Sequence, residues 1–525
     1  MKRFRLTTAS KVLIMLLVIV LIGGGVYGGI KKGLITTSKD NKKKNEVTIK
    51  TDEDGNVINT EKEDESTINL SLDEWIGWKE IIDANGGLST KEGSIYDKLG
   101  INVNISIIND ATQSSNALLS GNLDAAGYTI NRTAFLSNKF KKANFDVIMP
   151  YITNFSNGGD GIIAKSNIKT VKDLVNAKVG VPQFSEAHTL IVWFVNQSDL
   201  SKEEKDKIIK NLIFFETPDE AAKAFFAGQV DVAATWEPYL TQAKNMSDAH
   251  ILFSTVNSSS LVMDGILFSK KFAEENQEVV TKFIDGALQA SSMYETDLTT
   301  IKSVMPMFST ASDQDIKDNC AGAKLMTYGD NLKMFESTAK TIYTDMCDVW
   351  KSIGEEVNTD LVNTLYDNKY ITALSDKYDK NEVTENTTVK VTEENKKEVI
   401  DAEALLKKST TVNFIISTAK FTNTEEASKA LDEFIEIAKI LDGAIIEIAG
   451  NTDPNPNSDP DDSLNKKLST SRADAVKNYF VMNGISPDRI ITIGNGSSNP
   501  IVKNDTEEHK AMNRRTDISF KMIEQ

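Results

Sequence analysis

The chain has 525 residues, of which 40% are hydrophobic and 26% are charged, and its net charge is −17. The length allows more than one domain, and the composition is that of a folded chain. The negative charge argues against a nucleic-acid partner, because a phosphate backbone needs a basic face.

The N-terminus carries a membrane signal. Val12–Ile30 is a run of 19 residues without a charge, just long enough to cross a bilayer core, and basic residues precede it at Lys2, Arg3, Arg5 and Lys11. We therefore expect a cytoplasmic N-terminus at 1–11 and a single transmembrane anchor at 12–30, with the bulk of the chain outside the cytoplasm in the periplasm or cell-wall space. The alternative is a cleaved signal peptide.

Composition divides the rest of the chain. Residues 31–67 are polar with mixed charge runs and read as a flexible tether. A second polar stretch separates two regions with globular patterns. We expect a large domain at 68–375, a linker at 376–410 and a small domain at 411–525.

The large domain alternates strand-like and helix-like segments, which predicts an α/β architecture with sheets covered on both faces. A typical helical pattern is Asp219–Phe226, which follows a capping region at Thr217. The predicted strands are Val103–Ile108, Asp146–Met149, Gly161–Ala164, Lys178–Val181, Leu212–Phe215, Val230–Ala234 and Gly265–Phe268.

An internal echo suggests two similar lobes. Ala117–Gly127 (ALLSGNLDAAG) and Ala224–Ala234 (AFFAGQVDVAA) each run from an apolar helix end through a Gly stop into a strand. We expect a first lobe at about 68–165 and 263–375, a second lobe at about 166–262, and a ligand cleft that closes by hinge motion. Chance similarity of two common helix–strand junctions is the alternative.

Three ordered segments carry a family resemblance: NFSNGGDG at Asn154–Gly161, the run Lys169–Leu190, and the run Asp219–Leu240. Together they resemble the nitrate/sulfonate/taurine-type solute-binding proteins of ABC importers, over about residues 68–355. The resemblance implies a type II two-lobed periplasmic-binding-protein fold, a small-molecule solute and an ABC permease as partner.

Candidate ligand-binding residues follow strand ends, where open α/β sheets bind ligands. Trp75 and Trp78 can provide aromatic faces, or else pack in the core. Gly158, Gly159 and Gly161 would let the backbone approach a ligand closely. The full set is Trp75, Trp78, Asp110, Asp160, Gln183, Phe184, Ser185, Glu186, His188, Trp236, Glu237 and Asp264.

The charge of these candidates indicates the kind of solute. Five of them are acidic and none is Arg or Lys, whereas an anion needs cationic groups or a helix N-terminus. We therefore expect an amine, amidine or pyrimidine-like solute, with Trp faces available for cation–π contact. The alternatives are an anion such as nitrate, a sulfonate or taurine, and carboxylates that only cap helices or lie on the surface.

The C-terminal region predicts a small α/β sandwich. Strands are expected at Val412–Ile416, Ala444–Ile448, Arg489–Ile493 and Thr516–Phe520, and helices at Thr424–Leu441 and Ser471–Asn483.

Motifs in this region resemble the OmpA-like peptidoglycan-associated family: GNTD at Gly450–Asp453, NKKLSTSRADAV from Asn465, GISPDRIITIGNG, and MNRR ending at Arg515. The resemblance implies that Asp453 pairs with the ammonium of the peptidoglycan peptide stem and that Arg472 holds its carboxylate, supported by Asn465 and Arg515. A mutual Asp453–Arg472 salt bridge is the alternative. The loop between these two residues is longer than usual, and His509-Lys510 replaces the family's Gly-Arg, which puts binding strength in doubt.

No catalytic motif or plausible triad occurs, so we expect a binding protein and not an enzyme. A solute sensor or cell-wall-linked scaffold is the rival interpretation. Cys320 and Cys347 have no Cys or His at ligand spacing, and only three His residues occur, so we expect no metal and no cofactor. Two buried thiols are expected there, with a disulfide as the alternative.

Overall fold

The computed structural model describes residues 66–521, except 385–389, 403, 411, 413, 416 and 455–461. The predicted N-terminus, the predicted anchor at Val12–Ile30 and nearly all of the predicted tether lie outside the described residues. Within the described part of the chain, no helix is both long enough and apolar enough to span a bilayer.

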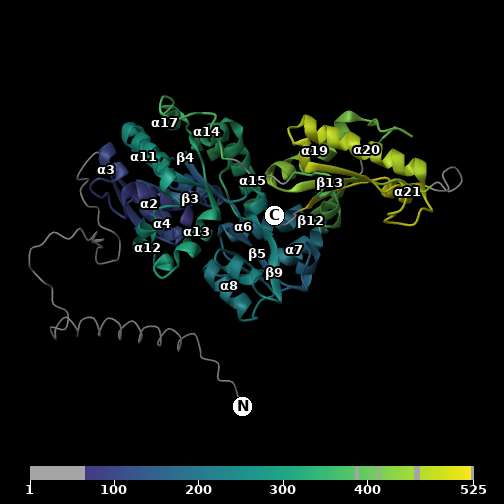
Figure 1. Ribbon diagram of the computed structural model, residues 1–525, viewed down its shortest axis with the longest axis horizontal. Coiled ribbons are helices and arrows are strands. Elements are labelled where there is room, and N and C mark those ends of the chain that lie inside the picture. Colours follow the sequence, from purple (N-terminus) through teal and green to yellow (C-terminus); the bar gives the residue numbers. More distant parts are fainter. Residues whose placement is uncertain are drawn as a thin grey trace, which may run out of the picture. The chain divides into compact units, whose positions relative to one another are not determined.

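A six-stranded sheet forms the centre of the first lobe, in the order β11-β4-β10-β3-β1-β2. Figure 1 labels two of its strands, β3 and β4. Strands β1, β2 and β3 run parallel to one another, and β10 runs antiparallel to both β3 and β4. The inner strands are buried almost throughout, as expected for a sheet covered on both faces. The strands are β1 (Thr67–Leu72), β2 (Asn102–Ile107), β3 (Ala125–Thr129), β4 (Val147–Ser156), β10 (Met263–Ser269) and β11 (Ala323–Leu325).

Short polar side chains start several helices of this lobe. Ser94, Asp110 and Thr129 each accept a hydrogen bond from a backbone N–H in the first turn, which satisfies a donor that the helix leaves free. The helices are α2 (Lys79–Asn85), α3 (Ile95–Leu99), α4 (Ala111–Leu119), α5 (Ile130–Lys142), α10 (Lys270–Glu275), α11 (Gln277–Ala290), α12 (Thr299–Val304), α13 (Asp313–Ala321), α14 (Tyr328–Lys333), α15 (Ala339–Ser352), α16 (Val362–Leu365) and α17 (Lys369–Thr372).

The second lobe has a five-stranded sheet in the order β7-β6-β8-β5-β9. Its strands are β5 (Asp160–Lys165), β6 (Val179–Pro182), β7 (Ile213–Phe215), β8 (Val232–Trp236) and β9 (Ala249–Ser254), and its helices are α6 (Glu186–Gln197), α7 (Lys202–Lys210), α8 (Pro218–Phe226) and α9 (Tyr239–Lys244). Strand β5 pairs antiparallel with β8 and β9. The second lobe therefore includes Asp160–Lys165, whereas the sequence placed the boundary at about 165/166.

The internal echo corresponds to the same structural unit in both lobes. Each copy is a helix that ends before a Gly with positive φ (Gly121, Gly228) and leads into a strand, α4 to β3 and α8 to β8. The carboxylate of Asp124 accepts the backbone N–H of Asn69, and that of Asp231 accepts the backbone N–H of Lys178. The shared Asp thus ties each strand to the neighbouring parallel segment, which explains why both copies carry it.

The chain passes between the lobes twice, after β4 and after β9. Thr255, in the second crossing, links the two segments. Its hydroxyl lies 2.8 Å from the Ser156 hydroxyl and accepts the backbone N–H of Gly158 at 3.0 Å. Ser156 and Thr255 are fully buried. Two adjacent crossings linked at one point have the form of a hinge, because only a few residues need to change their dihedral angles.

The predicted linker at 376–410 is not a single free segment. Its beginning packs on the first lobe, since Tyr378 donates to the Asp285 carboxylate at 2.7 Å and the Thr384 hydroxyl donates to Asp330 at 2.6 Å. Its end, α18 (Lys396–Asp401) and β12 (Ala404–Thr410), belongs to the C-terminal domain, where β12 pairs with β15. The predicted start of that domain at 411 was therefore too late.

The C-terminal domain has a four-stranded sheet in the order β12-β15-β13-β14, in which β13 (Ile445–Gly450) and β14 (Ile490–Gly494) are parallel. Its other elements are β15 (Thr516–Lys521), α19 (Thr424–Ile440), α20 (Ser463–Met482) and α21 (Glu507–Asn513). The strand predicted at Val412–Ile416 was wrong: among its described residues, Phe414 forms an isolated bridge with Phe421. Helix α20 begins eight residues earlier than predicted.

Cys320 and Cys347 are buried free thiols, so the disulfide alternative is wrong. Burial raises the pKa of Cys320 to about 12 and that of Cys347 to about 11. Both thiols therefore stay protonated at neutral pH and act as small core side chains.

Candidate functional site

A small cavity of about 20 Å³ lies between the two lobes. Residues from both lobes and from the second crossing line it. They are Asp73, Trp75, Thr129, Asp160, Glu186, Trp236, Val262 and Asp264. The sequence predicted five of these eight, namely Trp75, Asp160, Glu186, Trp236 and Asp264. Four of the eight are carboxylates, and we call Asp73, Asp160, Glu186 and Asp264 the carboxylate cluster.

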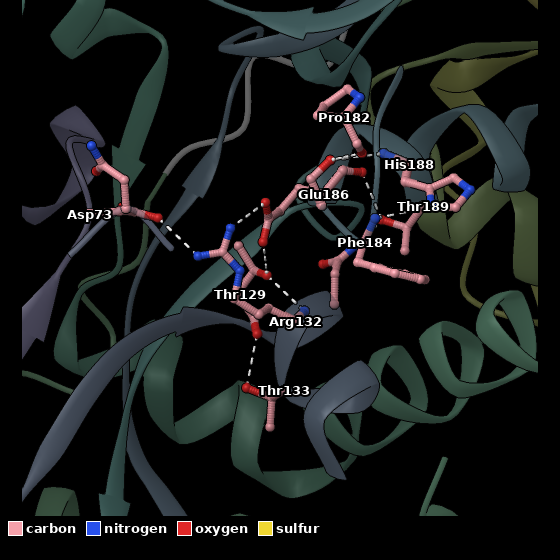
Figure 2. A network of polar contacts seen from close by, with 12 residues as sticks. Asp73, Thr129, Arg132, Thr133, Pro182, Phe184, Glu186, His188 and Thr189 are labelled. Atoms are coloured by element: carbon pink, nitrogen blue, oxygen red, sulfur yellow. Dashed lines mark hydrogen bonds and ion pairs between the residues drawn. The ribbon is translucent and has the colours of Figure 1, made fainter. Parts of the chain in front are cut away.

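Arg132 bridges the lobes beside this cavity (Figure 2). Its guanidinium pairs with Asp73 of the first lobe at 3.1 Å and with Glu186 of the second lobe at 3.0 Å. Thr129 also donates its hydroxyl hydrogen to Glu186 at 2.7 Å. Burial lowers the pKa of Arg132, but Glu186 and Asp73 outweigh it and raise the pKa overall. Arg132 is therefore a fixed cation that these two carboxylates already share.

Asp160 and Asp264 have no such cationic partner among their hydrogen bonds in the described structure. They are 5% and 3% exposed. Burial, together with the negative charges of Glu186 and Asp73, raises the pKa of Asp160 to about 7. Burial and the carboxylates of Asp73, Glu186 and Asp160 also raise the pKa of Asp264 well above its usual range. One oxygen of Asp264, Oδ2, is buried with no hydrogen-bond partner, which is costly unless a ligand supplies a donor.

Trp75 is held in the cavity wall by its surroundings. Its indole N–H donates to the Asn154 amide oxygen at 3.1 Å. A Cβ on Gly77 would lie 2.4 Å from the Trp75 indole nitrogen and from the Asn154 oxygen, and a Cβ on Gly159 would lie 2.5 Å from the Trp75 ring. Gly159 therefore gives room to Trp75, whereas the sequence suggested that the glycines there make room for a ligand.

Replacing Gly77 by Ala is expected to break the Trp75–Asn154 hydrogen bond and displace the Trp75 ring from the cavity. We expect the affinity of the cavity for a bound molecule to fall by about tenfold, the worth of one aromatic contact. Equilibrium titration combined with tryptophan fluorescence measures both effects. Gly121→Ala, a change far from the cavity at a Gly with open space around its Cβ position, is the control and should cost stability but not affinity.

The other predicted ligand residues lie outside the cavity lining. Trp78 is buried, and its indole N–H donates to Asp73 at 2.7 Å, so it supports a cavity residue from behind. Asp110 is exposed and caps α4, and Gln183 is exposed. The Glu237 carboxylate accepts the backbone N–H and the hydroxyl of Thr241, as a local turn group.

Phe184, Ser185 and His188 pack at a separate contact between the lobes. Phe184 stacks on Phe135 of the first lobe with ring centroids 4.7 Å apart. His188 lies edge-on to Trp350, and burial lowers its pKa to about 4, so it is neutral at physiological pH. Ser185 caps α6 by accepting the backbone N–H of His188. These residues fix the start of α6 and thereby the position of Glu186.

Sequence reasoning missed Asp73, Thr129, Val262 and Arg132. A signal existed for the first two, since Asp73 directly follows β1 and Thr129 ends β3, the same strand-end rule used elsewhere. Arg132 lies in the first turn of α5 and not at a strand end, so this rule did not identify it. The predicted candidates included no Arg or Lys, whereas the structure places Arg132 beside the cavity.

The four predicted peptidoglycan residues lie in the C-terminal domain, where residues 455–461 of the long loop are outside the described structure. Asp453 forms an ion pair with Arg514 at 3.3 Å. The guanidinium of Arg472 lies 4.9 Å from the Phe414 ring centre and donates to the Thr418 carbonyl at 3.1 Å. Burial and the nearby Arg514 lower the pKa of Arg472, while Asp453 opposes them.

Two further predicted residues have structural partners. Arg515 forms a two-pronged ion pair with Asp517, both contacts at 2.9 Å, and donates to the Asn499 carbonyl. The Asn465 amide donates to the Asp462 carboxylate at 3.0 Å. His509, one of the departures from the family pattern, pairs with Asp505 on the surface. Arg515 thus has a carboxylate partner within its own strand region. Arg472 donates to a neutral carbonyl, so its charge is less fully paired than that of Arg515.

Comparison with known proteins agrees with both predicted resemblances. Residues 88–294 match the profile described as NMT1/THI5 like, and residues 413–514 match the OmpA family. The two-lobed α/β part of the chain therefore contains a region similar to the NMT1/THI5 like family, and the C-terminal domain is similar to the OmpA family.

Individual relatives fall into the same two groups. Outer membrane protein A of Bordetella avium is 42% identical over 101 residues, which are 19% of this chain and 50% of that protein. The peptidoglycan-binding protein ArfA of Mycobacterium tuberculosis is 40% identical over 88 residues, 17% of this chain and 26% of that protein. The chain thus spans about half or less of the length of these relatives.

Among solved structures, the periplasmic aliphatic sulphonate binding protein SsuA of Escherichia coli superposes with a TM-score of 0.46 and 15% sequence identity. The superposition covers 58% of this chain and 99% of that protein.

Proposed function

We propose that this protein is the extracytoplasmic solute-binding component of an ABC importer, that it captures a small organic cation between its lobes, and that its OmpA domain holds peptidoglycan. The two matched regions support the combination of solute capture and cell-wall attachment. The relative from Mycobacterium tuberculosis is named as a peptidoglycan-binding protein, which supports the second role.

The charge of the cavity is the observation that carries the solute class. The carboxylate cluster places four acidic groups around one guanidinium, that of Arg132. Buried carboxylates without a counter-charge are unfavourable, and a bound cation would supply it. Trp75 and Trp236 add aromatic walls that favour a cation over an anion. An amine, amidine or protonated pyrimidine-like solute meets these conditions.

An anion would be repelled by the negative charge of the carboxylate cluster. The guanidinium of Arg132 already pairs with Asp73 and Glu186, so a nitrate or sulfonate would have to displace a carboxylate to reach it. It would also lie against Asp160 and Asp264. Placing like charges together in a buried site costs several kcal/mol.

A thermal-shift screen of the full-length protein tests the solute class. Amines, amidines, guanidines, pyrimidines, nitrate, taurine and other sulfonates are each added at equal concentration, with sodium chloride at the same ionic strength as control. A ligand at about 100 times its dissociation constant adds roughly 2.7 kcal/mol of stability. We expect the melting temperature to rise with small cations. A rise with nitrate or sulfonates alone would refute the proposed solute class.

The attachment of the protein follows from the same proposal. Val12–Ile30 would anchor the chain in the cell membrane, and the predicted tether that follows it would give the solute-binding lobes reach toward a permease. In the OmpA domain, Asp453 would bind the ammonium of the peptide stem and Arg472 its carboxylate, with Asn465 and Arg515 in support. The protein would thus be fixed to the membrane at one end and to the cell wall at the other.

A further inference from the structure

The carboxylate cluster is assembled from both lobes. Asp73 and Asp264 follow or begin strands of the first lobe, whereas Asp160 and Glu186 belong to the second. Because hinge motion in this fold moves one lobe relative to the other, closing the cleft brings two pairs of carboxylates together. Arg132 can balance only one negative charge of the four. Closure therefore concentrates negative charge in a buried space.

The groups that face Asp160 and Asp264 offer little further compensation. Asp160 has the Ser156 hydroxyl as a hydrogen-bonding neighbour and the carboxylates of Glu186 and Asp73 as charged neighbours. The charged neighbours of Asp264 are the same two carboxylates, the carboxylate of Asp160 and the guanidinium of Arg132. The phenol of Tyr294, which also senses the charge of Asp264, is neutral because burial raises its pKa. Arg132 is the cation among these neighbours.

We infer that the charge of the carboxylate cluster controls closure of the two lobes, so that either protons on Asp160 and Asp264 or one bound cationic solute is required for the closed form. The second half of this inference rests on the proposed function; the first half does not. A cationic solute and protons then substitute for each other, and solute binding near neutral pH releases protons.

The direction of the pH effect follows from the raised pKa values of the closed form. With the lobes apart, water solvates the carboxylates and their pKa values are near the usual range of about 4. In the closed form the pKa of Asp160 is about 7 and that of Asp264 is also raised. The closed form therefore binds more protons, so lowering the pH between about 7 and 4 favours it. Each proton taken up changes the ratio of closed to open protein by up to tenfold per pH unit.

Distance measurement between the lobes tests this without knowledge of the solute. Spin labels are attached to Lys98→Cys on α3 and Glu203→Cys on α7, both exposed positions, while Cys320 and Cys347 are buried. Pulsed electron resonance then gives the distance distribution in the full-length protein at pH 5 and pH 8.5. We expect the shorter distance to dominate at pH 5 and to lose population at pH 8.5.

Variants assign the effect. Asp160→Asn with Asp264→Asn removes both titrating groups and should keep the short distance at both pH values. Asp110→Asn, an exposed carboxyl outside the cavity at a position where Asn caps equally well, should behave as the wild type. Circular dichroism confirms that each variant is folded. A wild-type distance that does not change with pH, or a double variant that responds as the wild type does, would overturn the inference.

Adding acetamidinium chloride at pH 8.5 separates this inference from the proposed function. Recovery of the short distance supports both. A pH response without any response to acetamidinium or to the other cations of the screen would support proton control and refute the cationic solute. Calorimetric titration in buffers of different ionisation enthalpy should show about one proton released for each cation bound. No proton release on binding would refute the substitution of solute for protons.

Discussion

Replacing Asp264 by Asn is expected to weaken binding of the proposed cationic solute by about 100-fold at pH 8. The substitution keeps the shape of the side chain but removes the buried charge whose Oδ2 atom has no protein partner. Losing one member of a buried, hydrogen-bonded charge pair costs roughly 2–5 kcal/mol. Equilibrium titration of the full-length protein with the strongest cation of the thermal-shift screen measures the change.

The same substitution is expected to raise the melting temperature of the protein without added solute. Because the folded-state pKa of Asp264 is raised, ionising it opposes folding at every pH above its usual value of about 4. The gain from Asn should therefore be larger at pH 8 than at pH 5, by about 3 °C or more. Asp110→Asn should change neither affinity nor melting temperature. Equal affinity in Asp264→Asn and the wild type would contradict the assignment of this carboxylate to the solute site.

Replacing Arg472 by Gln is expected to lower binding of the OmpA domain to peptidoglycan by about 10- to 100-fold. The Arg472 guanidinium is largely buried over Phe414, and the nearby Arg514 repels it, so a carboxylate of the peptide stem would relieve an unfavourable charge. A charge-assisted hydrogen bond of this kind contributes about 1.5–3 kcal/mol. Co-sedimentation of the full-length protein with purified murein sacculi measures the loss.

Two variants make this test specific. Lys503→Gln removes an exposed cation of the same domain and should sediment as the wild type does. Arg472→Lys keeps the charge but loses the planar fork, so it should recover only part of the binding. Unchanged sedimentation of Arg472→Gln would show that Arg472 does not hold the peptide stem.

The fold was predictable where local patterns and burial agree. The echo between Ala117–Gly127 and Ala224–Ala234 identified the repeated helix–turn–strand unit. In both lobes the Gly has a positive φ after the helix, and the Asp accepts a backbone N–H of the neighbouring segment. The position of the crossing after β4 could not be predicted from local pattern. The sequence of β5 is compatible with a strand in either sheet, and only its pairing with β8 and β9 places it in the second lobe. Strand β12 was missed because its residues, ALLKKST, look like the polar end of a linker.

The site was predictable to the extent that strand ends identify it. Trp75, Asp160, Glu186, Trp236 and Asp264 lie at or near strand ends and meet in one cavity. His188 and Glu237 satisfy the same sequence rule, but the fold turns them toward local partners. Arg132 could not be found from strand ends, because it reaches the cavity from the first turn of a helix. The pairing of Arg132 with particular carboxylates depends on tertiary contacts, which cannot be derived from the spacing of residues in the sequence.

The most direct test of the cationic site compares two ions of nearly identical shape and opposite charge. Acetamidinium and acetate are both planar and carry one methyl group, so their difference in effect reports the charge preference of the cavity. We predict that acetamidinium raises the melting temperature of the full-length protein at pH 8 and that acetate at the same concentration and ionic strength does not. A rise with acetate and none with acetamidinium would contradict a cation-binding cleft.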